Sequence, residues 1–357
     1  MIKFTTYPSS GIAWTSDVRH IDIALDTDKQ VVFELKAFHD DAYITVFSAS
    51  YYSYDKTVSV RAIAYTLEAW MRSAGVPIAR FSIRAAAGGE AATATFIAVY
   101  SATQMNVLPT KWLTSRYLTT LSSICVPSTG EVLLPYISDD DTAEAIFKGT
   151  YLKDGVSTAF ETSYLPEPDI FADNYLAGVI DASPSIVAGL ASVEASQLQT
   201  YSVVYGARVF AVVISPAIRI APTLLRFRNQ FNAVEAVALE GMTTRKTDIE
   251  RSEAVIDGES KYYDQSVTRS CELQTAPLSY DEALWMEQLY SSYEVRDPQG
   301  NKILITDSTA EVSDDFSGST THKITWRYAD GRISADRHQY ALPADRIFQP
   351  PFDIQFT

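Results

Sequence analysis

The pattern of hydrophobic and polar positions in the first hundred residues predicts a sheet. Apolar residues alternate with polar ones over 21–25 and again over 31–35, on either side of a polar turn at 26–28. A period of two on both sides of a turn is typical of a half-buried hairpin. The segment 43–52 is rich in β-branched and aromatic residues, which predicts a further strand that turns into another one at 57–60.

The period changes to that of a helix after the last of these strands. Apolar residues recur at a spacing that places them on one helical face: Ile63, Leu67, Trp70, Met71 and Ala74. Gly75 and Pro77 follow this stripe and supply a stop signal. We expect the helix to lie against the sheet, which is completed by two further strands at 81–84 and 91–101.

The middle of the chain has a weaker pattern. We predict strands over 112–120 and 131–137, and a pair of strands within the apolar stretch 201–214. The acidic run 139–141 precedes a short helix-like segment at 142–148. Acidic residues are favoured in a first helical turn, so we interpret this run as the start of a helix.

The last third of the chain contains one strongly signalled helix. Ser279 and Glu282 have the spacing of a capping box, and a stripe of large apolar residues follows them: Trp285, Met286, Leu289, Tyr290 and Tyr293. Strands at 233–239 and 267–274 precede this helix. A turn at 297–301 follows it and separates two strand-like segments.

These patterns predict a mainly β fold with a few α-helices (α+β), built from several domains of antiparallel β-sandwich or tube-like form. The expected domains are an N-terminal β-rich domain with one helix (1–105), a middle β-rich domain or insertion (106–220), a C-terminal β-sandwich-like domain with one helix (221–342) and an extended C-terminal arm (343–357). Pro350, Pro351 and Phe352 mark this arm, which we predict to be an assembly contact.

The net charge and the apolar pattern of the chain exclude two classes of partner. The 357 residues carry 29 basic and 44 acidic side chains, a net charge of −15, and no basic stripe stands out. An acidic surface repels phosphate, so we expect no nucleic-acid partner. The start of the chain contains Asp17, Arg19 and His20 without an apolar run, and no apolar stretch is long enough to cross a bilayer. We therefore expect neither a signal peptide nor a membrane partner.

The charge is also distributed unevenly. Residues 1–105 hold nine basic and ten acidic side chains, whereas 106–220 hold six and twelve, and 221–342 hold thirteen and twenty. Charged residues are depleted at the cores of protein interfaces. The nearly neutral N-terminal domain is therefore the expected face for contacts with other proteins.

The sequence carries no signature of catalysis. It lacks the motifs GxSxG, HExxH, GxxxxGK[ST] and GxGxxG. Cys125 and Cys271 have no CxxC partner, and the four histidines are isolated from them, so we expect two buried thiols and no metal or cofactor. We predict that the protein is not an enzyme.

Two acidic features of the sequence have more than one interpretation. Asp139, Asp140, Asp141 and Glu144 form the densest acidic cluster, which could bind a hard cation, although helix capping is the favoured interpretation. Asp314 and Asp315 precede a glycine and are interpreted as turn residues. Two carboxylates that meet only in the folded chain leave no sequence signal, so an acidic-site enzyme is a further alternative.

Three tyrosines are the candidate binding residues. Tyr51, Tyr52 and Tyr54 could form a stacking platform for a glycan. The more ordinary interpretation is a strand whose faces belong to the core and to an interface.

The chain also shows a resemblance to a known group of proteins. The string 227–232 before a strand, the capped helix 280–293 and the hairpin 303–327 resemble the carboxy-terminal region of tail-associated structural proteins from phages and prophages of Bacteroidetes-type hosts. The strand-turn-strand that leads into the helix at 63–74 looks like the amino-terminal part of the same group. The likeness covers about two thirds of the chain and is thin over 106–220.

This resemblance implies a virion component that is made in the host cytoplasm and acts by assembly. Its expected partners are other tail or virion proteins and further copies of itself, with no catalytic residues and no cofactor. The expected function is that of a structural subunit of a phage tail or tail-tip (baseplate or distal-tail) assembly. The alternative is a glycan- or receptor-binding module that uses exposed aromatic residues.

Overall fold

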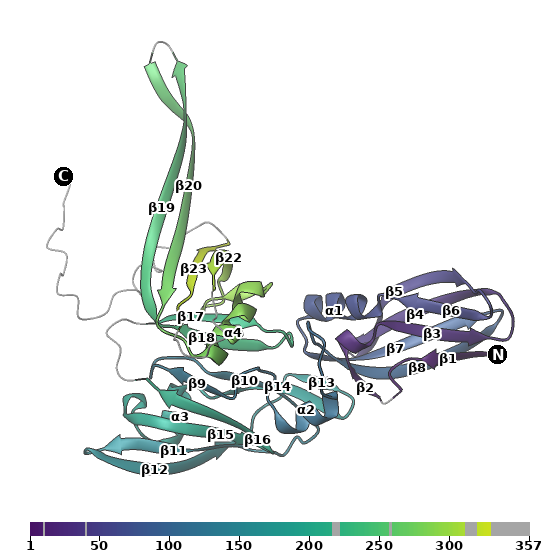
Figure 1. The fold of residues 1–357 in the computed structure, drawn as a ribbon, viewed down its shortest axis with the longest axis horizontal. Coiled ribbons are helices and arrows are strands. Elements are labelled where there is room, and N and C mark those ends of the chain that lie inside the picture. The colour runs from purple at the N-terminus through teal and green to yellow at the C-terminus, as the bar shows by residue number, and fades with distance from the viewer. Residues whose placement is uncertain (10, 40, 216–221, 257–258, 311–319, 330–357) are drawn as a thin grey trace. The chain divides into compact units, whose positions relative to one another are not determined.

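A computed structural model shows a mainly β fold with four α-helices among the described residues, which confirms the predicted fold class (Figure 1). The predicted assembly arm 343–357, with Pro350, Pro351 and Phe352, lies outside the described part of the chain, as do Asp314 and Asp315. The structure describes all residues except 10, 40, 216–221, 257–258, 311–319 and 330–357.

The chain divides into two compact units. Unit 1 contains residues 1–125, 131–214 and 227–236. Unit 2 contains 126–130, 215–226 and the residues from 237 onward. The domain boundaries predicted near residues 105 and 220 stay predictions.

The N-terminal part of unit 1 consists of two sheets that share one core. The first has the order β1-β3-β6 and the second has the order β2-β8-β7-β4-β5. Their inward-facing residues belong to one hydrophobic cluster, with Ile21, Ile23, Phe33 and Phe81 fully buried in it. The elements are β1 (Ile2–Thr6), β2 (Ile12–Trp14), η1 (Thr15–Asp17), β3 (His20–Leu25), β4 (Gln30–His39), β5 (Ala42–Tyr52), β6 (Thr57–Arg61), α1 (Ile63–Ala74), β7 (Ile78–Ala87) and β8 (Glu90–Val99).

The predicted helix is confirmed as α1. Its stripe faces the core, where Ile63, Leu67 and Met71 are buried. Gly75 ends the helix in the left-handed region at φ 69°, and its amide donates to the carbonyl of Arg72. A glycine adopts this conformation without steric cost, which explains the stop signal.

The predicted hairpin over 21–35 is wrong in its pairing. Strand β3 pairs with β1 and β6, whereas β4 pairs with β5 and β7, so the turn at 26–28 carries the chain from one sheet to the other. Both strands alternate as expected. Alternation shows which face of a strand is buried, but it does not identify the neighbouring strand.

The remainder of unit 1 contains two more sheets. One has the order β12-β11-β15-β16-β9 and the other the order β10-β14-β13. The elements are α2 (Pro109–Ser115), β9 (Ser123–Val126), β10 (Leu133–Ser138), β11 (Ala145–Lys153), β12 (Val156–Tyr164), β13 (Ile170–Ala172), β14 (Tyr175–Asp181), α3 (Pro184–Ala191), η2 (Ala195–Gln197), β15 (Leu198–Tyr205) and β16 (Arg208–Ile214).

Two predictions in this region are wrong. The strand expected over 112–120 does not form. Residues 112–115 belong to α2, which begins with Pro109 in the first helical turn, where proline needs no amide donor, and 116–120 belong to no helix or strand. The helix-like segment expected at 142–148 is mostly β11. The carboxylate of Asp140 accepts from the amide and the hydroxyl of Thr142 at 2.8 and 2.7 Å, so this acidic residue closes a local turn and caps no helix.

A buried arginine connects the elements of this region. Arg208 is 4% exposed, and its guanidinium donates to the backbone carbonyls of Leu113, Arg116, Ile137 and Tyr205. These acceptors come from α2, β10 and β15 and their flanking residues. Burial lowers the pKa of Arg208, because the charged form loses its water, and the carbonyl oxygens supply the polar contacts that offset this loss.

The segment 227–236 joins the parts of unit 1. Phe231 is fully buried, with its ring centroid 6.0 Å from that of Trp14 and 5.5 Å from that of Trp112. The side-chain amide of Asn229 donates to the carbonyl of Leu118 at 2.6 Å. Asn232, at φ 57°, donates to two carbonyls at the end of α1 and just beyond it.

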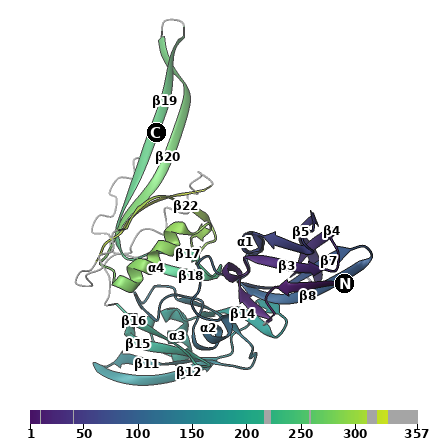
Figure 2. The same ribbon diagram turned by 45° about the vertical axis from the view of Figure 1, so that its right-hand side comes forward.

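Unit 2 is built on a sheet of order β18-β17-β21-β22-β23-β20-β19, with one helix against it (Figure 2). The tips of β17 and β18 belong to unit 1. The elements are β17 (Thr223–Arg228), β18 (Val234–Leu239), β19 (Gly241–Ile256), β20 (Glu259–Thr275), α4 (Tyr280–Ser291), β21 (Val295–Arg296), β22 (Lys302–Thr309) and β23 (Lys323–Tyr328).

The predicted capping box of α4 is confirmed. The hydroxyl of Ser279 accepts from the amide of Glu282 at 3.3 Å, and the Glu282 carboxylate accepts from the amide of Ser279 at 3.0 Å. The stripe behind it is buried at Trp285, Met286 and Leu289. Tyr293 departs from the prediction, because the helix ends at Ser291 and this tyrosine is 44% exposed.

Candidate functional site

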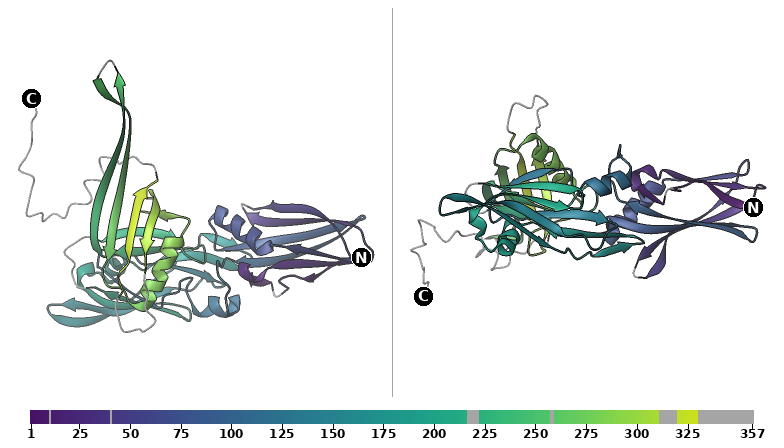
Figure 3. Two further views of the ribbon diagram at one scale, coloured as in Figure 1. Left: turned by 45° about the horizontal axis from the view of Figure 1, so that its top comes forward. Right: turned by 90° about the horizontal axis from the view of Figure 1, so that it is seen from below.

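The most unusual feature of unit 2 is the hairpin formed by β19 and β20. The two strands pair along their whole length, from Gly241 opposite Thr275 to Ile256 opposite Glu259. Only the segment 271–274 of β20 also pairs with β23. The outer segments 246–256 and 259–270 therefore form a two-stranded ribbon that extends beyond the rest of the sheet (Figures 1 and 3).

The ribbon is long and has no core of its own. The segment 246–256 of β19 has 11 residues, which at about 3.3 Å per residue gives the ribbon a length of roughly 36 Å. Large apolar side chains on the ribbon are exposed, namely Ile249 (52%), Val255 (73%), Tyr262 (60%) and Val267 (40%). A two-stranded hairpin without packing on either face is marginally stable in water.

A pocket lies at the root of the ribbon. Arg245 is opposite Cys271, and Thr247 is opposite Arg269, so all four side chains share the face that carries the buried Leu273 further along. The face thus changes from apolar to cationic as the hairpin leaves the sheet. The pocket has a volume of about 300 Å³.

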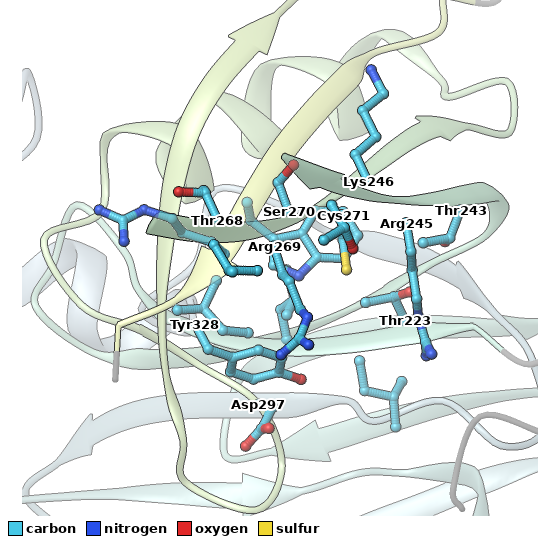
Figure 4. A pocket seen from close by; sticks show the side chains of 17 residues that line it. Thr223, Thr243, Arg245, Lys246, Thr268, Arg269, Ser270, Cys271, Asp297 and Tyr328 are labelled. Carbon is cyan, nitrogen blue, oxygen red and sulfur yellow. The ribbon is translucent and has the colours of Figure 1, made fainter. Parts of the chain in front are cut away.

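The other side of the pocket comes from the sheet. Its apolar floor includes Leu225 and Trp326, which are 1% and 3% exposed, together with Ile303. Figure 4 shows Arg245 and Arg269 pointing from the ribbon toward this side, with Tyr328 and Asp297 beneath them.

The charges around the pocket are not balanced. Asp297 is the only carboxylate among the lining residues, and both of its oxygens are engaged by Asn301, whose amide and side-chain nitrogens donate at 2.8 to 3.0 Å. Among the described residues, no carboxylate forms an ion pair with Arg245 or Arg269. Residue 246 also lines the pocket, but the Lys246 side chain points to the opposite face of the ribbon (Figure 4) and pairs with Glu272.

Cys271 provides a thiol within the same pocket. Burial raises the pKa of this thiol, and the nearby guanidinium of Arg245 partly opposes that rise. The thiol is half-buried, whereas Cys125 is exposed, so the expectation of two buried thiols is wrong for Cys125. Cys125 lies on β9, where alternate residues face outward.

A second unusual surface is the edge of the N-terminal five-stranded sheet. Strand β5 is the last strand of this sheet and pairs with β4 over residues 42–52. These eleven residues include no charged residue and no proline, although Tyr43, Ile44 and Tyr52 are exposed. Natural edge strands are commonly protected by charges or proline, which this edge lacks.

The three candidate tyrosines lie at the end of this edge. Tyr52 and Tyr54 are 76% and 88% exposed, whereas Tyr51 packs against the core of the N-terminal sheets. Neighbouring residues of a strand point to opposite faces, so Tyr51 and Tyr52 do not share one surface. The structure therefore leaves two of the three tyrosines available for stacking, and their binding role stays a prediction.

The acidic cluster does not form a compact site. Asp139, Asp140 and Asp141 are exposed, and the Glu144 carboxylate accepts from the hydroxyl of Ser163 at 2.7 Å. Within the described residues, no group of three or more His, Cys, Asp or Glu side chains is placed to hold a metal ion. None of the helices in the described ranges is long and apolar enough to cross a membrane.

Sequence reasoning missed most of the ribbon, although a signal for it exists. The prediction covered only 267–274 of its two strands. The dipeptide Asp257-Gly258 stands midway between the two strands, and such a dipeptide is among the strongest hairpin signals. The meeting of Arg245 with Arg269 depends on the register of this hairpin and has no local signal.

Comparisons with known proteins do not identify a family. No family model matches the chain, and no curated protein matches it. A solved structure described as "Chimeric titin Z1Z2 functionalized with a KLER exogenous peptide from decorin" is similar at 13% sequence identity over 60% of this chain and 97% of that chain. Its TM-score is 0.14, which is too low to support an argument about fold or function.

Proposed function

We propose that this protein is a structural subunit of a multi-subunit particle, of the phage tail or tail-tip type, and that it acts through protein–protein contacts. The observation that carries the proposal is the ribbon of β19 and β20, which is roughly 36 Å long by strand geometry. The tail assignment itself rests on the resemblance of segments such as 227–232 and 280–293.

The ribbon supports the assembly proposal because its exposed apolar side chains are unfavourable in water. Its apolar side chains, such as Val255 and Tyr262, are more than half exposed, and among the described residues only 271–274 of β20 pair with a further strand. A partner that packs on one face would bury these side chains and supply the packing that a two-stranded hairpin lacks. An exposed hairpin that is kept by a folded protein therefore suits an arm that reaches a neighbouring subunit.

The edge strand β5 supports the same function. Its outer row of amide and carbonyl groups can pair with a strand of another chain, and no charge along 42–52 opposes this pairing. The near-neutral charge of residues 1–105 also reduces repulsion between copies of a chain that carries −15 overall.

The test compares the full protein with a shortened ribbon. Residues 251–265 are deleted, and Glu250 is joined to its partner Ser266 through an Asn-Gly turn. We expect the full protein to form concentration-dependent oligomers in sedimentation velocity experiments, and the shortened protein to remain folded and lose them. Tyr52→Ser/Tyr54→Ser is the control, and it should still form oligomers.

The proposal fails if the full protein stays monomeric at high concentration and also binds no tail protein encoded beside it. It fails equally if the shortened protein assembles as the full one does.

A second candidate function is glycan or receptor binding through Tyr52 and Tyr54. The observation that favours it is the high exposure of both rings. In that case the full protein gives hits on a glycan array, and Tyr52→Ser/Tyr54→Ser loses them while the shortened ribbon keeps them. An array without hits removes this candidate.

A further inference from the structure

The pocket at the root of the ribbon combines two chemistries. Its ribbon side presents the guanidinium groups of Arg245 and Arg269 and the exposed Val267. Its sheet side presents the half-buried Tyr328 beside the buried Trp326. Asp297, the one carboxylate among the described lining residues, is hydrogen-bonded to Asn301 and forms no ion pair with either arginine. Its single negative charge cannot balance both guanidinium groups. The site is a local positive region in a strongly acidic chain.

The two guanidinium groups indicate the charged part of a ligand. Guanidinium groups bind carboxylates through paired hydrogen bonds, and such charge-assisted bonds are stronger than neutral ones. The hydroxyls of Thr243 and Thr247, on the same ribbon face, add further donors.

The accessible apolar side chains of the lining indicate the remainder of the ligand. A free inorganic anion would make no use of Val267, which is 40% exposed on the same ribbon face as Arg269, or of the half-buried Tyr328. A group with an apolar body uses this surface, and a volume of about 300 Å³ is at the lower end of the range for ligand pockets. The pocket therefore suits a carboxylate next to one aromatic or branched side chain.

We propose that this pocket binds an acidic peptide segment of a partner protein, in which a carboxylate engages Arg245 and Arg269 and an adjacent apolar side chain contacts Val267 and the ring of Tyr328. This inference rests on the proposed assembly function, because it makes the root of the ribbon the place where a partner chain is held. The same chemistry in a free aromatic carboxylate is the competing source, which the experiment separates.

The binding experiment uses the full protein and an acetylated, amidated pentapeptide of sequence Gly-Gly-Asp-Phe-Gly in isothermal titration calorimetry. The matched peptide has Asn in place of Asp. We expect the Asp peptide to bind, and the Asn peptide to bind at least about tenfold more weakly. N-acetylphenylalanine and inorganic phosphate are titrated as the small-molecule arms, and both should bind more weakly than the Asp peptide.

Variants of the protein locate the site. Arg245→Gln and Arg269→Gln should each weaken binding of the Asp peptide by about tenfold. Lys246→Gln is the matched control, because it removes one positive charge from the neighbouring residue on the opposite face of the same strand. It should leave binding unchanged. All three side chains lie on the exposed hairpin, so circular dichroism should show the same fold for each variant.

Cys271 gives an independent readout inside the pocket. In a Cys125→Ser protein, the rate at which N-ethylmaleimide alkylates Cys271 should fall when the Asp peptide is bound. An unchanged rate at saturating peptide would place binding elsewhere and refute the inference.

Other results also overturn it. They are the absence of peptide binding, equal binding of the two peptides, an equal loss in Lys246→Gln, or binding of phosphate or N-acetylphenylalanine that is as tight as that of the peptide. The two proposals fail separately. A protein that forms oligomers but binds no peptide refutes the pocket inference alone, whereas one that binds the peptide but never assembles refutes the assembly function alone.

Discussion

Asn232 offers a direct test of how unit 1 is held together. Its side-chain amide donates to the carbonyls of Met71 and Val76 at 2.8 and 2.9 Å, it is fully buried, and its backbone has φ 57°. Asn232→Gly keeps a relaxed backbone but removes both hydrogen bonds. The carbonyl of Met71 still accepts from the amide of Val76, whereas the carbonyl of Val76 loses its donor, which we expect to cost about 2 kcal/mol of unfolding free energy. Asn232→Ala adds the strain of a Cβ in the left-handed region, for a total of about 3 kcal/mol.

Asn232→Asp tests the direction of these hydrogen bonds. An ionised carboxylate would face two carbonyl oxygens and donate to neither, so this variant should lose more stability at pH 7 than Asn232→Ala. Repulsion raises the pKa of the new carboxyl in the folded state, so the deficit relative to the natural protein should shrink as the pH falls and the carboxyl gains a proton. Asn174→Asp, at an exposed turn, is the control and should change stability by less than about 0.5 kcal/mol.

Urea denaturation followed by tryptophan fluorescence measures these differences at pH 7 and at pH 5. Equal losses for Asn232→Gly and Asn232→Ala would refute the backbone part of the reasoning. A pH-independent deficit for Asn232→Asp, or a deficit smaller than that of Asn232→Ala, would refute the hydrogen-bond part.

Three further predictions concern other parts of the chain. Burial lowers the pKa of His322, so the neutral form contributes stability above pH 6.5 that is lost as the pH falls. The melting temperature of His322→Gln should therefore decline less between pH 7.5 and pH 5.5 than that of the natural protein. Arg208→Met leaves several carbonyls unpaired and should cost about 3 kcal/mol in urea denaturation, while a loss below about 1 kcal/mol would contradict its role. Deleting 343–357 should weaken oligomers in sedimentation velocity and leave the melting temperature of the monomer unchanged; a lower melting temperature would show that the segment belongs to the core.

Local signals in the sequence predict local structure well. The stripe from Ile63 to Ala74 with Gly75 after it, and the capping box of Ser279 and Glu282, each specify a helix through contacts within a few residues. The mainly β fold follows from the alternation of the strands for the same reason.

Features that depend on distant residues are not predictable in this way. Which strand neighbours β3 is decided by the packing of two sheets, and α2 forms where its apolar residues also suited a strand. The pocket shows the limit most clearly. Arg245 and Arg269 lie 24 positions apart in the sequence and share a face only because of the hairpin register, so no spacing rule identifies them.

The segment 227–236 has a consequence for how the protein is made. Unit 1 takes most of its residues from the first 214, yet Phe231, whose ring packs against both Trp14 and Trp112, is synthesised later than all of these. A nascent chain on the ribosome, or a fragment cut at residue 220, therefore lacks the ring that packs on this tryptophan pair and leaves the end of α1 without its asparagine donor. Unit 1 therefore reaches its final packing only after residues 227–236 have been synthesised and have packed against it.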